Sequence, residues 1–442
     1  MRLRDLAQRE LRIVFGARVT WFALAAATLL VGHSFVLAVD LYSAASRSAL
    51  GFGLMRREMD PLSGIVRPLL GGLHLSATML VPVIASRGLA IEHERRTYGA
   101  LCLAAGSTTA VIAVKTACAL LAAFSLMSPV VVLLGVYVAL GGVLDAPETA
   151  VALGGHLLHL AAITGVALAA AAVTRSVARA ATVAVLVSLA SWAVDAGEGF
   201  AALAWVGRLD WASVSRQLEP FEHGIVPVGA VTWFVALGGT GYALAFLAGR
   251  IEPARRGLGR ALGVVGVGAL ALGWTSGWHR GCDWSEQRRA SLPPNVVDAL
   301  RQVPGAIRLD VYLDRDDGRR AQLERDTLAK LLLARPDLEV SAPLDGRSAP
   351  REGDRNDGYG RIVVHAGSGV RETRSTSRRE VSTLIFEAAG RLVPDWTQPV
   401  YSGYPFVIEG RGRAGAGLVA YLLLPGLVLA VGGSAVRIRR RP

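Results

Sequence analysis

Cysteine is scarce in this sequence, and Cys102, Cys118 and Cys282 are the only three in 442 residues. The first two fall in or beside apolar stretches, so only Cys282 lies in the large polar region. No disulfide can therefore form within that region. No Cys-x-x-Cys pair or zinc-ligand spacing occurs either. These absences exclude redox or metal chemistry through cysteine.

Lysine is scarcer still, since Lys115 and Lys330 are the only two. A Walker A loop needs Gly-Lys-Ser/Thr, because its backbone cradles phosphates while the lysine reaches the β- and γ-oxygens. Lys115 follows Val114 and Lys330 follows Ala329, so the chain holds no such loop. If ATP drives this protein, another subunit must bind it.

Other catalytic patterns are also missing. No serine-hydrolase nucleophile elbow occurs. The net charge of +12 comes without a basic groove interleaved with aromatics, so nucleic-acid binding is not indicated. The run GRGRAG at residues 410–415 formally matches Gly-x-Gly-x-x-Gly, but a predicted membrane span follows it in place of a βαβ unit, which favours a linker. The sequence thus indicates no enzyme activity and no directly bound cofactor.

Long hydrophobic runs are what the chain has in abundance. Hydrophobic residues make up 52% of it and come in blocks of about twenty, enough to cross a bilayer at about 1.5 Å per residue. They predict a predominantly α-helical integral membrane protein of about eight spans, a six-span unit plus two. The predicted spans are residues 19–41, 68–90, 110–140, 149–173, 181–194, 226–248, 261–277 and 414–436.

Arginine clusters predict the orientation of these spans. They lie before the first span, between the fourth and fifth, between the sixth and seventh, and after the eighth, all on the side that the positive-inside rule assigns to the cytoplasm. Arg47, Arg56, Arg57 and Arg67 in the loop after the first span oppose this register, but four clusters outweigh one loop. The clusters are Arg2, Arg4, Arg9, Arg12 and Arg18; Arg175 and Arg179; Arg250, Arg255, Arg256 and Arg260; and Arg437, Arg439, Arg440 and Arg441. We expect a multi-pass protein of the bacterial cytoplasmic membrane with both termini in the cytoplasm.

The sequence pattern after the seventh span predicts a small extracytoplasmic α/β domain. Residues 306–314 alternate apolar and polar side chains as a half-buried strand does, and residues 319–337 have helical periodicity. Further strands are predicted at 338–342 and 361–365, and a second helix begins at Ser377, with Glu380 completing a capping box.

The predicted domains are residues 1–18, an amphipathic interface helix with no sign of a cleavable signal peptide; 19–250, the six-span unit; 251–278, a linker and the seventh span; 279–413, the α/β domain; and 414–442, the eighth span and a basic tail.

A charged segment, residues 87–107, interrupts the apolar pattern between the second and third spans. Even one charge costs about 2.5–3.5 kcal/mol at the centre of a membrane helix, so this segment must emerge into water. Its mixture of acids and bases suits docking onto a partner. Lys115, just inside the third span, either snorkels to the interface, which we favour, or marks a polar site.

Three further features have structural interpretations. His156 and His159 share one face of the fourth span, where contacts within the bundle are expected, because no further metal ligand is evident. Gly259 and Gly263 form Gly-x-x-x-Gly, which predicts close helix packing. The segment LEPFEHGIV, residues 218–226, combines carboxylates with a histidine, but no nucleophile or metal constellation accompanies them. We interpret it as a re-entrant or interfacial segment.

The arrangement resembles the type-2 permease subunits of ABC transporters, with an interface helix, six spans and a cytoplasmic coupling segment between the second and third spans. The match consists of an acidic-basic cluster followed by Gly-x-Leu-x-Leu, with Ala100 and Cys102 where the family favours Thr and Glu, and with Lys115 following. Residues 218–226 resemble an element of gliding-motility-type permeases, and the later region is similar to a shortened auxiliary subunit of such permeases. The resemblance assigns coupling to Glu92, His93, Glu94, Arg95, Arg96, Gly99, Leu101 and Leu103, and an interfacial element to Glu219, Phe221, Glu222, His223 and Gly224.

This resemblance implies a permease subunit that is not an enzyme and has no ATP-binding site of its own. It would couple ATP hydrolysis by a separate ATPase subunit to export of a substrate. It would pair with a second permease unit, lie in membrane lipid and bind no nucleic acid. The alternative is a non-transporting sensor or scaffold that acts through its extracytoplasmic domain. The substrate cannot be read from the sequence.

Overall fold

The structure is a computed structural model of the whole chain, and it describes residues 2–51, 55–56, 59–174, 176–197, 209, 211–249, 254–275, 278, 280–314, 317–344, 358–396 and 401–440. It divides into two compact units. Unit 1 comprises Met1–Gly224, Gly229–Gly277 and Tyr401–Pro442, and unit 2 comprises Ile225–Val228 and Trp278–Val400. Four of the arginines used to predict orientation, Arg57, Arg175, Arg250 and Arg441, lie outside the described residues.

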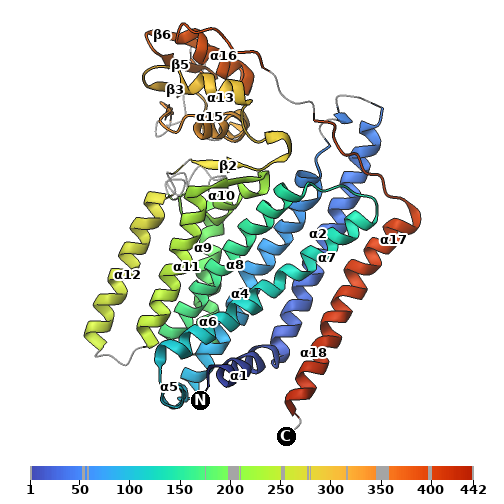
Figure 1. Cartoon of the computed structure of the whole chain (residues 1–442), viewed down its shortest axis with the longest axis vertical. Helices are drawn as coiled ribbons and strands as arrows, with labels where there is room; N and C mark the ends of the chain where they lie inside the picture. Colours follow the sequence, from blue (N-terminus) through green and yellow to red (C-terminus); the bar gives the residue numbers. More distant parts are fainter. Residues whose placement is uncertain are drawn as a thin grey trace. The chain divides into compact units, whose positions relative to one another are not determined.

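Unit 1 is a bundle of long apolar helices (Figure 1). Its helices are α1 (Leu3–Phe15), α2 (Arg18–Ala49), α4 (Arg67–Glu94), α5 (Tyr98–Ala105), α6 (Thr108–Phe124), α7 (Ser128–Ala139), α8 (Ala146–Thr174), α9 (Val177–Gly197), α10 (Val214–Leu218), α11 (Val228–Gly249), α12 (Ala254–Thr275), α17 (Gly410–Leu418) and α18 (Leu424–Arg440). Short helical turns adjoin them: η1 (Leu62–Val66), η2 (Ser125–Met127), η4 (Phe221–His223) and η8 (Val419–Leu423).

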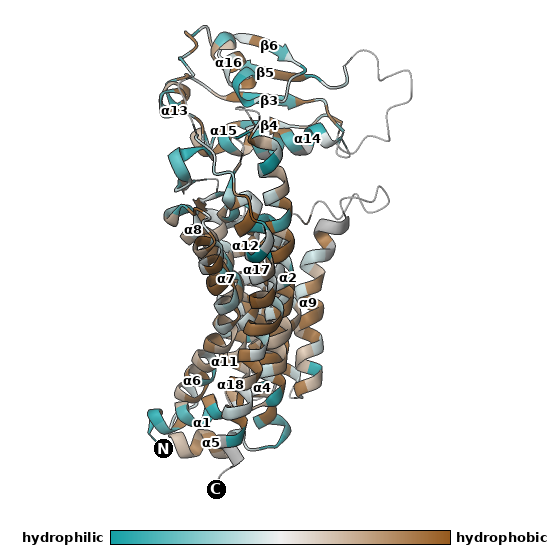
Figure 2. Ribbon diagram, turned by 90° about the vertical axis from the view of Figure 1, so that its right-hand side faces the viewer, coloured by the Kyte–Doolittle hydropathy of each residue, from teal (hydrophilic) through white to brown (hydrophobic). Residues whose placement is uncertain are grey.

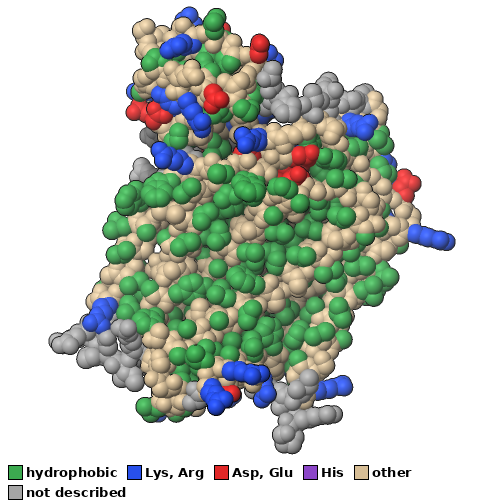
Figure 3. Space-filling view, in the orientation of Figure 1, with side chains coloured by type: hydrophobic (Ala, Val, Ile, Leu, Met, Phe, Trp, Pro, Cys, Tyr) green, Lys and Arg blue, Asp and Glu red, His purple; other side chains and the backbone are tan. Residues whose placement is uncertain are grey.

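Six continuous helical stretches among the described residues are long and apolar enough to cross a membrane. They correspond to the predicted spans one to four, six and eight, while the fifth and seventh correspond to the shorter apolar stretches Val177–Trp192 and Gly259–Thr275. Hydrophobic side chains form a broad band over unit 1, with charged side chains at its ends (Figures 2 and 3). This surface is that of a helical membrane protein, as the sequence predicts.

The C-terminal helices belong to the same bundle, where they pack against α2. Contact is close, because a Cβ added at Gly32 would lie 2.7 Å from the carbonyl oxygen of Ala420. The extended chain before α17 is hydrogen-bonded to the end of α2: the amides of Phe406 and Ile408 donate to the hydroxyls of Ser46 and Ser43, each at 3.0 Å. Residues 401–413 are thus tied to the first span, a tie that hydropathy could not reveal.

Glycines also bring α8 and α11 into contact, although not the glycines that the sequence suggested. A Cβ at Gly241 would lie 2.3 Å from the backbone carbon of Gly165, and one at Gly165 would lie 2.6 Å from the carbonyl oxygen of Gly238. Gly259 and Gly263 on α12 meet nothing within 4 Å, so the prediction of close packing there is wrong. The motif is common by chance in a chain with 50 glycines.

Gly241→Ala is expected to destabilise the bundle, because the added methyl group meets backbone atoms that no side-chain rotation can move. Overpacking of this kind costs about 1–3 kcal/mol. Gly239→Ala is the matched control on the same helix, since its methyl group would meet nothing within 4 Å. Thermal unfolding of the two purified variants in detergent measures the difference. Equal midpoints for both variants would show that α8 and α11 do not pack as described.

Unit 2 contains a four-stranded sheet in the order β4-β3-β5-β6. Strand β3 pairs in parallel with β4 and antiparallel with β5, and β5 pairs antiparallel with β6. The helices α13, α15 and α16 enclose a core with the sheet through apolar residues such as Leu300, Leu331 and Ile385. The elements are β3 (Ile307–Val311), β4 (Glu339–Ser341), β5 (Ile362–Ala366), β6 (Gly369–Thr373), α13 (Pro294–Arg301), α14 (Gly318–Leu323), η6 (Glu324–Leu328), α15 (Ala329–Ala334) and α16 (Arg378–Ala388).

The predicted strands and helices of this unit are confirmed, with additions. Strand β6, helix α13, the short turn η5 (Glu286–Arg288) and the antiparallel pair β1 (Ile225–Pro227) and β2 (Gly281–Asp283) were not predicted. Ser377 does precede α16, but its side chain makes no capping hydrogen bond, and the hydroxyl of Thr373 donates to Glu380 instead. The capping-box prediction is therefore wrong in its bonding although correct in position.

Candidate functional site

The charged segment between the second and third spans folds as a short helix between two sharp turns. Helix α4 ends at Glu94, and Arg96 then adopts a left-handed conformation, with φ of 59°, before α5 begins at Tyr98. Helix α5 ends at Ala105 and is capped by Gly106, whose φ is 70°, and the hydroxyl of Ser107 accepts from the amide of Ala110 at the start of α6. The chain thus makes a compact helical excursion at the end of the bundle where α1 lies (Figure 1).

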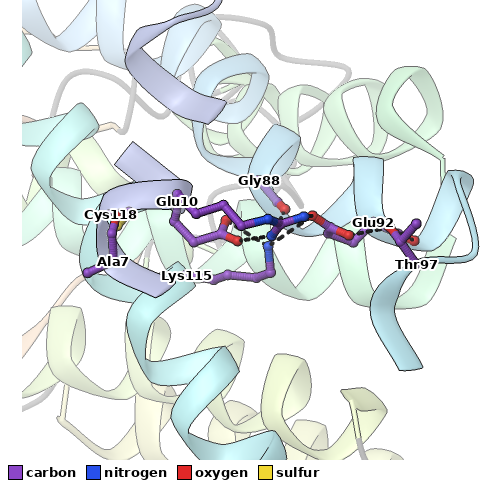
Figure 4. Close-up of polar contacts among 8 residues, drawn as sticks. Ala7, Glu10, Gly88, Glu92, Thr97, Lys115 and Cys118 are labelled. Carbon is purple, nitrogen blue, oxygen red and sulfur yellow. Dashed lines mark hydrogen bonds and ion pairs between the residues drawn. The ribbon is translucent and has the colours of Figure 1, made fainter. Parts of the chain in front are cut away.

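Behind this excursion lies a buried network of charges that joins α1, α4 and α6 (Figure 4). The ammonium of Lys115 on α6 donates to Glu10 on α1 at 2.7 Å and to the carbonyl of Gly88 on α4 at 2.9 Å. The same ammonium lies 4.0 Å from Glu92 on α4. Side-chain exposures of Lys115, Glu10 and Glu92 are 2%, 1% and 3%.

Arg9 completes this network from its rim. Its guanidinium donates to Glu10 at 2.9 Å and to Glu92 at 2.8 Å, and its side chain is 40% exposed. The hydroxyl of Thr97, just before α5, also donates to Glu92. Two cations therefore balance two carboxylates, which is what burial of ionised groups requires. We call Arg9, Glu10, Glu92 and Lys115 the buried charge network.

Helix α1 is amphipathic, and its buried face explains how a polar helix joins the bundle. Leu6, Glu10 and Val14 repeat every four residues and are all buried. The end of α1 is fixed by α2, where Thr20 donates to the carbonyl of Val14 at 2.7 Å and Trp21 donates to that of Phe15 at 2.5 Å. A carboxylate at the centre of this face needs the Lys115 ammonium, so α1 and α6 are matched by charge as well as by shape.

The network changes the interpretation of three predicted residues. Glu92 is buried and bonded inside the bundle, so it holds the segment in place and does not lie on its exposed surface. Leu101 lies on the buried face of α5. Lys115 does not snorkel, since its ammonium is enclosed by Glu10 and Gly88. The alternative interpretation of Lys115 as part of a polar site is correct.

The remaining predicted coupling residues divide into one that caps a neighbouring helix and several that face outward. Glu94 accepts from the amide of Val177 at 3.2 Å, so it binds the beginning of α9. The exposed positions of the segment are Glu94, Arg95, Arg96, Thr97, Gly99, Ala100, Leu103, Ala104, Gly106 and Ser107, and the Leu103 side chain is 84% exposed. His93 is half-buried and stacks on Tyr98 at a ring separation of 4.5 Å. The large exposed side chains of the segment are thus one leucine on α5 and, just before that helix, one glutamate and two arginines.

Residues 218–224 of the second predicted element lie against α4 and α8 at the opposite end of the bundle, while Ile225 and Val226 belong to strand β1 of unit 2. Phe221 is buried on Gly155, where a Cβ would lie 2.5 Å from its ring, and Gly224 turns the chain with a φ of 77°. Glu222 pairs with Arg67 at 3.0 Å and with His156 at 3.2 Å. Glu219 lies 3.8 Å from Arg67.

Histidines from two helices meet beside this element. His74 on α4 lies with its ring centroid 4.8 Å from that of His159 and 6.3 Å from that of His156, both on α8. His74 was not singled out from the sequence, because nothing in a single span shows which helix will face it. Expected contacts within the bundle are confirmed for both predicted histidines. The described residues contain no group of three or more His, Cys, Asp or Glu side chains arranged to hold a metal ion.

Unit 2 contributes one unusual titratable group, Lys330 on α15. Burial lowers its pKa to about 8, and the nearby positive charge of Arg378 adds to this effect. At pH 7.5 about a quarter of such a lysine is neutral, against about one part in a thousand for an ordinary lysine of pKa about 10.5. A neutral amine is a nucleophile, whereas an ammonium is not.

We therefore expect Lys330 to be acylated by a mild amine-reactive ester near neutral pH, with half-maximal reactivity near pH 8. Because the chain has only one other lysine, and that one is ion-paired inside unit 1, mass spectrometry can quantify the reaction at a single site. Arg378→Gln is expected to slow the reaction at pH 7.5, since losing the neighbouring cation raises the pKa. A rate that keeps rising to pH 10 would contradict this assignment.

The chain matches no protein-family model, no curated protein sequence and no solved structure.

Proposed function

We propose that this protein is the permease subunit of an ABC transporter and that α5 is the surface on which a separate ATPase subunit docks. The observation that carries the proposal is a short helix that joins two long apolar helices, bears an exposed leucine and is preceded by two exposed arginines. An apolar side chain flanked by arginine is the composition of the centre of many protein interfaces. The resemblance of the sequence to ABC permeases supports an ATPase subunit as the docking partner.

The construction of the excursion supports a mechanical role for α5. Its two ends are set by the left-handed turns at Arg96 and Gly106, and its first turn is held to the buried Glu92 by Thr97. Glu92 is in turn bonded to Arg9 on α1 and lies near Lys115 on α6. A displacement of α5 therefore acts on α1, α4 and α6 together, as coupling between two states of a bundle requires.

The charged side chains just before α5 suit a partner with negative charge on its docking surface. Arg95, Arg96 and Glu94 are exposed, and the Glu94 carboxylate accepts from the amide of Val177, while Glu92 is buried and bonded to Arg9. The surface is therefore more basic than the sequence of the segment suggests. Charged rims of this kind contribute mainly to the association rate and to the choice of partner. ATP would be bound by the partner, because this chain has no Gly-Lys pair.

Purification of the full chain from its own cells in a mild detergent tests this proposal. We expect an ABC-type ATP-binding subunit to purify with it in a constant ratio and the complex to hydrolyse ATP. Recovery of a signalling enzyme in place of an ATPase would favour the sensor or scaffold alternative, for which the separate core of unit 2 is the relevant observation. Recovery of the chain without any ATP-binding subunit after chemical cross-linking in intact cells would overturn the proposal.

A further inference from the structure

Three imidazoles lie together inside unit 1 between α4, α8 and α9. His74, His156 and His159 are 8%, 0% and 3% exposed, and the rings of His74 and His159 meet edge to face at a centroid separation of 4.8 Å. Ionisable side chains are rare within membrane-spanning helices and, where present, generally mark a pathway or a binding site. The function proposed above makes no use of this group, which we call the histidine cluster.

The hydrogen bond between Trp192 and His74 fixes the charge of one ring. An indole N–H can only donate, and it lies 3.3 Å from Nε2 of His74. Nε2 must therefore carry a lone pair, so His74 is neutral with its proton on Nδ1. A second proton on this ring would occupy Nε2 and break the bond from Trp192 on α9.

The other two rings have nitrogens without hydrogen-bond partners. Both ring nitrogens of His159, and Nδ1 of His156, are buried and make no hydrogen bond. Buried polar atoms are nearly always hydrogen-bonded in folded proteins, so unpaired ones require an explanation. Each neutral imidazole has one nitrogen that can accept a proton. The cluster therefore holds three basic nitrogens, of which only the one on His74 already accepts a hydrogen bond.

A carboxylate connects this cluster to the end of the bundle where α4 begins. One carboxylate oxygen of Glu222 accepts from Nε2 of His156 at 3.2 Å, and the other accepts from Nε of Arg67 at 3.0 Å. Burial alone would raise the pKa of Glu222, but the hydrogen bond to His156 and the charge of Arg67 lower it overall. Glu222 is therefore an anion at neutral pH, positioned to stabilise a cation on His156.

The remaining charged groups near the cluster are few. Arg67 on α4 is 40% exposed, and Glu219 and His223 flank Glu222, with Nε2 of His223 lying 3.5 Å from Arg67. Glu148 is buried two turns before His156 on α8, and Arg216 lies on α10. From α9, residues 180–192 carry no charge, and α11 carries none either. Glu222 is thus the carboxylate in contact with the cluster.

We propose that His74, His156 and His159 form a proton-binding site inside the helix bundle, with Glu222 as its counter-charge and its link to water. A proton is favoured over a metal ion because the rings of His74 and His159 are already in contact and the described residues form no metal-binding arrangement. A proton on His74 would remove the bond from Trp192, and a second proton on the cluster would place like charges on neighbouring rings. It would therefore loosen the contact of α4 with α8 and α9. This inference does not depend on the proposed function, since it rests on the cluster alone.

Histidine NMR of the full chain in lipid nanodiscs tests the site directly, with protons as the only ligand. We expect the cluster signals, assigned by their loss in His74→Gln, His156→Gln and His159→Gln, to be neutral at pH 8 and at least one to gain a proton as the pH is lowered. Three signals that stay neutral to pH 4.5 would overturn the proposal. His33→Gln is the matched control, because His33 lies on a span but bonds Tyr421 away from the cluster.

A second variant keeps the test decisive if the glutamine variants do not fold. Trp192→Phe retains all three imidazoles and removes only the donor that holds His74 neutral. Loss of one such hydrogen bond should make the site bind its proton about threefold to tenfold more tightly, which raises the pH of half-protonation. Unchanged titration in Trp192→Phe would contradict the proposed link between the proton and the contact of α4 with α9.

Discussion

Lys115→Met is expected to destabilise unit 1 by about 3–5 kcal/mol, which is the usual effect of removing one partner from a buried ion pair. Methionine fills a similar volume but leaves Glu10 without its 2.7 Å contact to the ammonium, and the carbonyl of Gly88 loses its donor. Arg9 remains to balance part of the charge, so two carboxylates would share one partly exposed cation. The free energy of unfolding in detergent, obtained from denaturant titration, measures the effect.

The double variant Lys115→Met with Glu10→Met separates charge from packing. Because replacing a buried ion pair by apolar side chains of similar size is often nearly neutral, the second substitution should recover most of the lost stability. Arg9 would then pair with Glu92 alone, at the 2.8 Å contact that it already makes. A double variant as unstable as Lys115→Met would mean that the charges do not act as a network.

Leu103→Glu is expected to weaken binding of the ATPase subunit by at least about 30-fold, since truncation or charge reversal at an interface centre costs about 2 kcal/mol or more. The side chain is 84% exposed, so the variant should fold normally and keep the unfolding temperature of the wild type. Binding of the purified ATPase to the permease in nanodiscs gives the affinity. The ATP hydrolysis that depends on the permease should fall in proportion.

Leu392→Glu provides the control, because Leu392 is 95% exposed and lies in unit 2. It introduces the same charge on an equally accessible leucine. We expect its ATPase affinity to match that of the wild type. Equal loss of binding in both variants would point to a general effect of added charge, and no loss in Leu103→Glu would remove α5 from the docking surface.

Much of the fold follows from patterns that act over short stretches of chain. Apolar runs of about twenty residues locate membrane-spanning helices because a bilayer of fixed thickness imposes that length. The alternation around Leu309 and Val311 likewise identifies strand β3, because side chains on a strand alternate between its two faces. These elements are encoded locally and were predicted with nearly correct bounds.

The site depends on which helices become neighbours, and no local pattern carries that information. Glu92 and Lys115 were recognised as important charges, but their contact with Glu10 arises only when α1 folds beneath α4 and α6. The contact of His74 with His159 arises only when α8 packs against α4, so the sequence around His74 does not single it out. Gly-x-x-x-Gly on α12 has the expected spacing without a partner, whereas Gly241 contacts Gly165 without forming a motif recognised beforehand.

A photo-reactive amino acid at position 103 tests the central claim most directly, because it reports what lies against α5 in the intact membrane. Leu392 is again the matched position, on the strength of its exposure. The account predicts that illumination of cells joins residue 103 covalently to an ATP-binding subunit, that position 392 gives no such product, and that Lys115→Met reduces the yield at 103. Adducts at 103 with lipid alone, or equal yields at both positions, would contradict it.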